Sequence, residues 1–161
     1  MTHIRRAGLL DAGPLSDLLC DIIRRGGTTA MTSPVSRQEL ECWMRAAPGR
    51  AAWHLAEDEA GLPLGVQWIE PHPALPPEAC DIATFTRPGQ TRLGVGSSLF
   101  DATRRIARAL GYAWINATIR ADNSAGLAYY QSRGFEPYAW HNNVPLAVRT
   151  RVNKVSSRFA L

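Results

Sequence analysis

The sequence is short of cysteine and of long apolar runs, and both shortages narrow what the chain can be. Cys20, Cys42 and Cys80 stand far apart and form no CxxC pair. We therefore expect neither a metal site nor a disulfide framework, and a reducing cytoplasmic location fits. No apolar run approaches the roughly 18 residues of a membrane helix, so no membrane span is expected. The apolar stretch before Asp11 is too short for a signal peptide.

Lysine is almost missing as well, because Lys154 is the one lysine among 18 basic residues. With 14 acidic residues, the formal net charge is +4. The arginines are scattered in runs no longer than two, whereas proteins that bind nucleic acid usually cluster their positive charge. We therefore expect no nucleic-acid partner. The arginines are interpreted as a solvated surface, with contacts to an anionic small ligand as the alternative.

Two common nucleotide-binding motifs are absent too. No Gly-Lys-Ser/Thr occurs in the sequence, which excludes a P-loop. Gly94 and Gly96 form a GxG pair, but the position of the third glycine in a dinucleotide fingerprint is occupied by Leu99. The glycine pair therefore needs another interpretation.

The features that are present predict one globular domain over residues 1–161. The chain is 45% hydrophobic and 20% charged, which is typical of a soluble protein with a sizeable core. Apolar periodicity, a capping box at 36–39 and stops at glycine or proline predict the elements. Helices are expected at 11–25, from 36 onward, at 94–110 and at 123–133. Strands are expected at 3–7, 51–57, 64–70, 79–86, 112–119, from 134 onward and at 148–155. The order βααβββαβαββ predicts an α+β fold on a mixed sheet.

The GxG pair lies between a predicted strand and the start of a long predicted helix. Glycines there allow a tight turn, and the free N–H groups at the helix start favour an anion such as a phosphate or pyrophosphate. Arg92 could add a charge-assisted contact. In isolation, the same pattern also fits an ordinary turn from strand to helix.

A second motif begins about thirty residues later, at Asn123. Asn123 can cap the helix that follows it, and Tyr130 lies seven residues on, two turns along the same helix face. Gly134 and Phe135 then end the helix and open a strand. Taken alone, this pattern also fits a plain cap and an aromatic residue at a packing interface.

Together the two motifs, an RxGxG-type loop and NxxxxxxYxxxGF, resemble the GNAT superfamily of acyl-CoA-dependent N-acyltransferases. The opening of the chain is loosely similar to the amino-acid and phosphinothricin acetyltransferases of that superfamily. The resemblance implies α/β/α layers, with a mixed, mostly antiparallel sheet flanked by helices, and acetyl-CoA as the co-substrate without a metal. It differs at Thr91, where Gln or Arg is usual, and at Gly126, where alanine is usual.

The resemblance also implies which residues bind the cofactor. The strand would offer backbone groups to the pantetheine arm, the loop would hold the pyrophosphate, and Asn123 would contact the pantetheine side. Tyr130 would lie beside the thioester sulfur and act as the general acid. The strand and loop residues in these roles are Thr84, Phe85, Thr86, Arg92, Leu93, Gly94, Val95, Gly96 and Ser97.

The chemistry of amide formation leaves the general base open. A backbone N–H near Phe85 could polarise the carbonyl, and Tyr130 could protonate the leaving thiolate. Asp81 is the candidate base, because it lies on the strand that leads to the cofactor. Ordered water is another option, as are three further side chains: His54, Glu70 and His72. Tyr129, one position before Tyr130, is expected to turn about 100° away on the helix.

The predicted function is therefore transfer of an acetyl group to a primary amine by direct attack on the thioester. A small-molecule or amino-acid-like acceptor is expected, contacted by the hydroxyl-rich segment 26–32. The alternatives are a protein N-acetyltransferase and a non-catalytic acyl-CoA-binding or regulatory protein. The apolar alternation over 144–161 suggests a terminal strand that pairs with or crosses to another copy, so a homodimer is one possible assembly.

Overall fold

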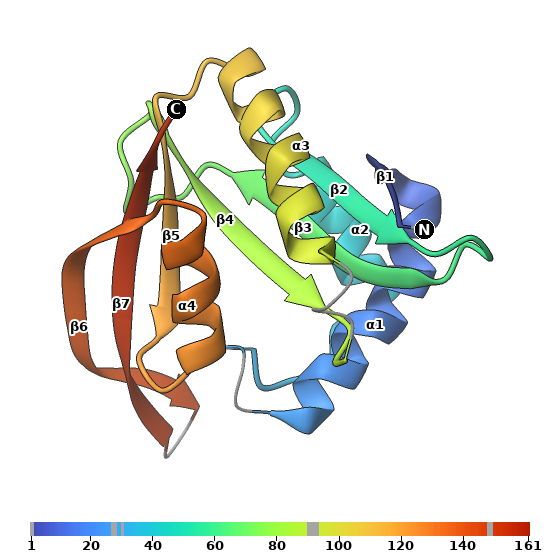
Figure 1. The fold of residues 1–161 in the computed structure, drawn as a ribbon. Helices are drawn as coiled ribbons and strands as arrows, with labels where there is room; N and C mark the ends of the chain where they lie inside the picture. Colours follow the sequence, from blue (N-terminus) through green and yellow to red (C-terminus); the bar gives the residue numbers. More distant parts are fainter. Residues whose placement is uncertain (1, 27–28, 30, 90–93, 148–149) are drawn as a thin grey trace.

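The computed structural model describes residues 2–26, 29, 31–89, 94–147 and 150–161 of the chain (Figure 1). The helices are α1 (Ala12–Arg25), α2 (Arg37–Arg45), α3 (Val95–Ala109) and α4 (Ser124–Ser132), and a short 3-10 turn, η1 (Leu9–Asp11), precedes α1. The strands are β1 (His3–Arg6), β2 (Ala52–Glu57), β3 (Pro63–Glu70), β4 (Ala79–Thr86), β5 (Trp114–Arg120), β6 (Glu136–Ala147) and β7 (Thr150–Ala160). The predicted order of strands and helices is confirmed.

The strands form one sheet in the order β1-β2-β3-β4-β5-β7-β6. Every neighbouring pair is antiparallel except β4 and β5, which run parallel. The last strand does not stop at Val155, as its alternation predicted, but continues to Ala160. Its apolar end pairs inside the chain, with Phe159 opposite Ile115 of β5. Within this chain, the tail therefore fills a place between β5 and β6 of the sheet.

Helices cover both faces of the sheet (Figure 1). On one face, α1 and α2 pack over an aromatic stack in which Trp68 lies between Trp53 and Phe85, with ring centroids 4.0 and 5.4 Å apart. On the other face lie α3 and α4. Helix α3 approaches β3 closely at Gly65, because a Cβ there would lie 3.1 Å from a methyl group of Val95. This is the layered, mostly antiparallel α+β fold that the sequence predicts.

The sheet opens in its middle, between β4 and β5. In the described part of the chain these strands pair only over Ala79–Asp81 and Trp114–Asn116. Beyond that point they diverge (Figure 1), while β4 stays paired with β3 as far as Thr86. The second half of β4 therefore keeps an edge of backbone groups that none of the described strands pairs with. Such an edge can bind an extended ligand.

Candidate active site

Helix α3 begins beside the open end of β4, at a turn formed by Gly94. The backbone of Gly94 is left-handed, with φ 68°, and the space around it is open. Only glycine adopts this conformation without strain. The N–H groups of the first turn of α3 follow directly, so the described part of the predicted loop, Gly94–Ser97, fits an anion-binding helix start. The predicted contacts of Arg92 and Leu93 lie outside the described residues.

Gly96 is a glycine for a different reason, which is its contact with Tyr129. A Cβ on Gly96 would lie 2.8 Å from Cε2 of the Tyr129 ring, closer than real Cβ contacts. The Tyr129 hydroxyl donates to the Gly96 carbonyl oxygen at 2.7 Å. The expectation that Tyr129 turns away from the site is therefore wrong. The small helix α4 packs both tyrosines inward, with their ring centroids 4.9 Å apart.

Asn123 caps α4, as its position predicted. Its Oδ1 accepts a hydrogen bond from the backbone N–H of Gly126 at 3.0 Å. A Cβ on Gly126 would lie 2.5 Å from the Asn123 Nδ2, so the glycine at the usual alanine position makes room for this cap. The cap fixes the start of the helix that carries Tyr130.

Tyr130 is buried, with 7% of its surface exposed, and its hydroxyl reaches β4. The Tyr130 hydroxyl and the Thr84 Oγ1 are 2.7 Å apart. Thr84 lies beyond the last residue pair of β4 and β5, so the phenol sits where the two strands diverge. Burial raises the pKa of Tyr130 above its ordinary value, partly offset by the hydrogen bond to Thr84. The phenol is therefore protonated at neutral pH and can serve as a proton donor.

Successive side chains of β4 point to opposite faces of the sheet. Thr84 points toward α4, whereas Phe85 packs into the aromatic stack under α1 and α2. Asp81 lies on the same face as Phe85, at the last residue pair before the strands diverge. The opening is thus flanked by a phenol on one face and a carboxylate on the other.

Asp81 is held by a neighbour on β5. The Asn116 Nδ2 donates to the Asp81 Oδ1 at 2.8 Å. Burial raises the pKa of Asp81, while the bond from Asn116 and the charge of His72 lower it. Glu70 lies opposite Asp81 on β3, and burial raises its pKa as well. A carboxylate with a raised pKa is a stronger proton acceptor than an ordinary one.

His54, another candidate for the general base, lies away from the opening between β4 and β5. It is buried on β2, two strands away from β4, and faces α3. Burial lowers the pKa of His54 to about 4, with further contributions from the charges of Arg6 and Arg105. A histidine this weakly basic, and this far from the opening, is a poor candidate for the base.

A cluster of polar side chains on the Asp81 face escaped the sequence analysis. Thr118 Oγ1 accepts from Asn116 Nδ2 at 3.0 Å and lies 2.8 Å from the Ser156 Oγ. The His141 Nε2 lies 2.8 Å from the same Ser156 oxygen, and Tyr138 donates to the Asn116 Oδ1. These residues come from β5, β6 and β7, so only the strand register brings them together. No local sequence signal could have singled them out.

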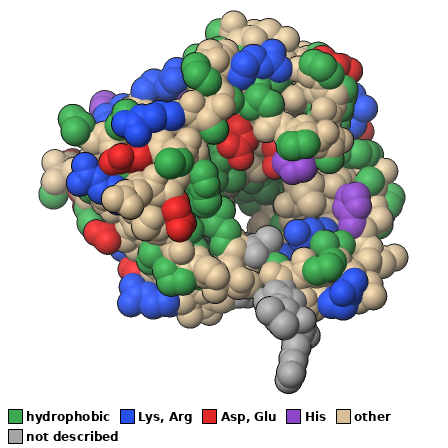
Figure 2. Space-filling model, turned by 180° about the vertical axis from the view of Figure 1, so that it is seen from behind, with side chains coloured by type: hydrophobic (Ala, Val, Ile, Leu, Met, Phe, Trp, Pro, Cys, Tyr) green, Lys and Arg blue, Asp and Glu red, His purple; other side chains and the backbone are tan. Residues whose placement is uncertain are grey.

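The same face is hollowed at its centre. Figure 2 shows hydrophobic side chains inside the depression, and acidic and histidine side chains along its edge. The segment between α1 and α2 reaches toward β5, because the Arg120 Nη1 lies 3.4 Å from the carbonyl oxygen of Thr29. Of the acceptor segment predicted at 26–32, residues 26, 29, 31 and 32 are described. The role of this segment in binding an acceptor stays a prediction.

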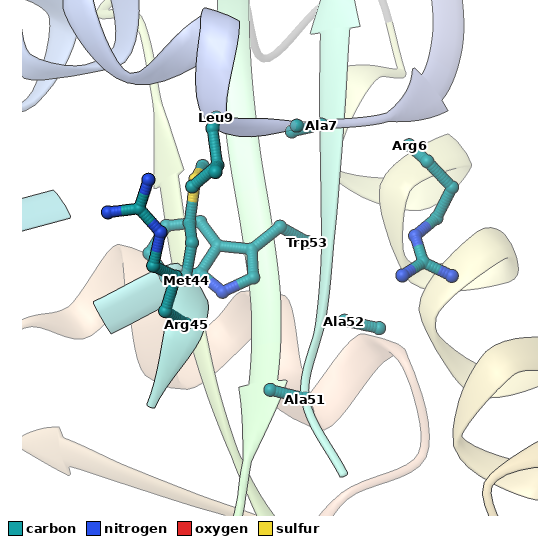
Figure 3. Close-up of a pocket in the computed structure, with 9 residues that line it drawn as sticks. Arg6, Ala7, Leu9, Met44, Arg45, Ala51, Ala52 and Trp53 are labelled. Atoms are coloured by element: carbon teal, nitrogen blue, oxygen red, sulfur yellow. The ribbon is translucent and has the colours of Figure 1, made fainter. Parts of the chain in front are cut away.

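A separate cavity of about 220 Å³ lies at the far edge of the sheet, near the end of β1 (Figure 3). Leu9, Met44 and Trp53 crowd together on one side of it, while the Arg6 side chain points away (Figure 3). This cavity lies apart from the opening between β4 and β5.

None of the described helices is long and apolar enough to cross a membrane. The described residues also hold no group of three or more His, Cys, Asp or Glu side chains placed to bind a metal.

The fold thus combines a sheet that opens between two parallel strands with a glycine turn and a helix start beside the opening. The chain belongs to the acetyltransferase (GNAT) family, whose model matches residues 19–135. The N-acyltransferase class expected from the two motifs is thereby confirmed. A comparison with curated proteins finds no significant match.

Solved structures agree with this assignment. A ribosomal-protein-alanine N-acetyltransferase from Brucella melitensis is 20% identical, with a TM-score of 0.88 and coverage of 99% of both chains. An N-acetyltransferase from Staphylococcus aureus is 18% identical, with a TM-score of 0.88, 99% coverage of this chain and 98% of the other. A phosphinothricin acetyltransferase from Sinorhizobium meliloti, solved with acetyl-CoA, is 17% identical, with a TM-score of 0.86 and coverage of 99% and 88%. At these identities the likeness establishes the fold.

Proposed function

We propose that the chain transfers an acetyl group from acetyl-CoA to a primary amine of a small molecule. The observation that carries this proposal is the pair of groups at the opening of the sheet. The Tyr130 phenol approaches it from the α4 face, and the Asp81 carboxylate approaches it from the hollowed face. A proton donor and a proton acceptor on opposite faces suit a reaction between two substrates that enter from opposite sides.

The residues present fit acetyl-CoA as the co-substrate. The turn at Gly94 and the start of α3 would hold the pyrophosphate, and the unpaired edge of Thr84–Thr86 would hold the pantetheine arm. When bound, acetyl-CoA supplies an activated acetyl group: its C–S bond breaks as the amine nitrogen forms the new C–N bond. The solved complex of the phosphinothricin acetyltransferase, with the same fold, supports this choice.

Two protons move in this reaction: one leaves the attacking amine and one is taken up by the departing thiolate. Side chains of the protein accept the first and donate the second. Asp81 accepts a proton from the attacking amine, and its burial makes it a stronger base than an exposed aspartate. A backbone N–H on the open edge of β4, at Thr84 or Thr86, stabilises the oxyanion. The Phe85 N–H itself faces β3, in the same way as the Arg87 N–H two residues on, which bonds to the Leu64 carbonyl oxygen. Tyr130 gives its proton to the departing thiolate. A phenol and a thiol have comparable pKa values in water, and burial raises the pKa of both in the same surroundings. Asp81 then releases its proton to solvent and the Tyr130 phenolate takes one up from solvent, which restores both groups for the next turnover.

Two observations favour a small acceptor over a protein tail. The Thr29 carbonyl oxygen contacts Arg120 at the end of β5, on the same face of the sheet as Asn116. The polar lining of the hollow is a compact cluster around Asn116 rather than a long acidic groove. A non-catalytic acyl-CoA-binding role would need neither the Tyr130 phenol nor the Asp81 carboxylate.

We further propose a cytoplasmic location, since Cys20, Cys42 and Cys80 are all free thiols.

The test is a screen of amino acids, polyamines, aminoglycosides and peptides, with thiol release from acetyl-CoA as the readout. We expect turnover with a subset of small amines. Asp81→Asn keeps the side-chain shape and its contact with Asn116, but removes the base. It should therefore lower kcat by roughly 10²- to 10⁴-fold. Turnover with peptides alone would replace the small acceptor by a protein, and the absence of turnover with every amine would contradict the proposal.

A further inference from the structure

A buried chain of hydrogen bonds joins Tyr130 to the start of α3. Gln67, on β3, is fully buried and lies opposite Thr84 of β4. The Gln67 Nε2 lies 2.8 Å from the Thr84 Oγ1 and 3.0 Å from the Tyr129 hydroxyl. Thr84 in turn contacts the Tyr130 hydroxyl at 2.7 Å, and Tyr129 contacts the Gly96 carbonyl oxygen at 2.7 Å. This series of hydrogen bonds thus connects Gly96, in the turn predicted to bind the cofactor, with Tyr130, the predicted general acid.

The chemistry of these groups fixes the direction of three of the four hydrogen bonds and leaves the contact between Thr84 and Tyr130 open to either direction. A carbonyl oxygen can only accept, so Tyr129 uses its single hydroxyl proton on Gly96. Tyr129 must therefore accept from Gln67, which means that the nitrogen of the Gln67 side chain faces it. The second N–H of the same amide group then points to Thr84, whose oxygen accepts it.

This direction has a consequence for Tyr130. The Thr84 hydroxyl accepts from Gln67 and keeps its own proton, which it can donate to the Tyr130 oxygen. The Tyr130 proton is then free to be donated to a group that is not part of this series of hydrogen bonds. With the opposite direction at this contact, Tyr130 would spend its proton on Thr84 and have none to donate.

We propose that Gln67 and Tyr129 are positioning residues that direct Thr84 to donate to Tyr130, which leaves the Tyr130 proton for the departing sulfur. The inference rests on the proposed acetyl transfer. In that step the O–H bond of Tyr130 breaks, the proton forms an S–H bond with the leaving thiolate, and the phenolate keeps the Thr84 hydrogen bond. A donor that faces a buried phenolate stabilises it more than a neutral phenol.

Three substitutions test the chain. Thr84→Val removes the donor with little change of volume, Thr84→Ser keeps it, and Gln67→Met removes the amide that fixes its direction. We expect Thr84→Val and Gln67→Met to lower kcat by roughly 10- to 100-fold with the KM for acetyl-CoA little changed. Thr84→Ser should restore most of the rate, because it keeps the hydroxyl.

A second readout does not depend on turnover. The NMR resonance of the ring Cζ in isotope-labelled tyrosine reports whether the phenol oxygen accepts a hydrogen bond, and Tyr130→Phe identifies the Tyr130 signal. We expect this resonance to shift in the same direction in Thr84→Val and Gln67→Met, and to stay near its wild-type position in Thr84→Ser. An unchanged resonance in both Thr84→Val and Gln67→Met would overturn the inference. If the wild-type protein turned over no amine, the proposed function would fail. The resonance would still show whether Thr84 donates its hydrogen bond to Tyr130.

Discussion

At the scale of single residues, the two glycines of the GxG pair do different jobs. Gly94 allows a left-handed backbone in open space, whereas Gly96 allows the Tyr129 ring to pack against the first turn of α3. The sequence pattern alone assigns both to the approach of a phosphate. The structure therefore changes what a substitution at Gly96 reports, since a lost cofactor affinity would also follow from a displaced Tyr129.

A double-mutant cycle separates these two effects. Gly96→Ala should lower the free energy of unfolding by about 1–3 kcal/mol, because the new Cβ overpacks the site against the Tyr129 ring. In a Tyr129→Leu background, we expect Gly96→Ala to cost much less, since the ring is gone. Denaturant unfolding of the four proteins measures the coupling. If Gly96→Ala lowered the unfolding free energy equally in the two backgrounds, contact with the Tyr129 ring would not be the reason for a glycine at position 96.

His54 should make the protein sensitive to acid. The folded-state pKa of His54 is lowered from 6.5 to about 4, so the unfolded chain binds a proton that the folded chain does not. The stability that comes from keeping His54 neutral is therefore present above pH 6.5 and is lost as the pH falls toward 4. We expect a loss of roughly 2–3 kcal/mol from this group.

The matched variant for this prediction is His54→Gln, which has no titrating ring. Unfolding free energies at neutral pH and near the folded pKa give the difference for each protein. We expect the wild type to lose more stability than the variant between the two conditions. The same loss in both proteins would assign the acid sensitivity to other groups.

At the scale of the elements, the last strand is the one whose extent changed most between sequence and structure. Phe159 packs against Phe100 of α3 and Phe135, with ring centroids 5.1 and 5.4 Å apart. The end of β7 thus closes the core beneath α3 and α4. We expect Phe159→Ala to lower the free energy of unfolding by about 3 kcal/mol in chemical denaturation. A cost within experimental error of zero would contradict this role for the strand end.

Local patterns predicted the elements well and the long-range contacts poorly. The cap at Ser36 and the helical periodicity of α1 are signals within a few residues, and the structure confirms both helices. Asn123 and Tyr130 share one short helix, so their motif could be recognised. Gln67 and Asn116 are single polar residues in strands, and neither carries a local signal. Their roles arise only when the strand register places them beside Thr84 and Asp81.

At the scale of the whole molecule, β6 forms one edge of the sheet and carries exposed aromatic side chains. Trp140 is 67% exposed and Tyr138 is 42% exposed. An exposed apolar edge strand is a site for association with another chain. We keep the homodimer as a prediction and assign it to this edge, because β7 is already paired on both sides.

Light scattering at micromolar concentration tests the dimer. We expect a mass near twice that of the 17.7 kDa chain. Trp140→Lys should convert the dimer to a monomer with little loss of stability, since the side chain is exposed. A monomeric wild type would contradict the assembly, and a dimeric Trp140→Lys variant would place the contact elsewhere.

The central claim is that Tyr130 protonates the leaving thiolate at the opening between β4 and β5. Tyr130→Phe keeps the ring and removes the hydroxyl. Tyr112→Phe is the matched control, because Tyr112 is equally buried but donates to the Arg50 carbonyl oxygen, outside the proposed site.

The measurement is kcat for acetyl transfer to the best amine of the screen, with coenzyme A affinity measured by calorimetry on the same proteins. We predict that Tyr130→Phe lowers kcat by roughly 10²- to 10⁴-fold and leaves the affinity nearly unchanged, while Tyr112→Phe retains both. Near-full turnover by Tyr130→Phe, with the same affinity for coenzyme A, would contradict the account.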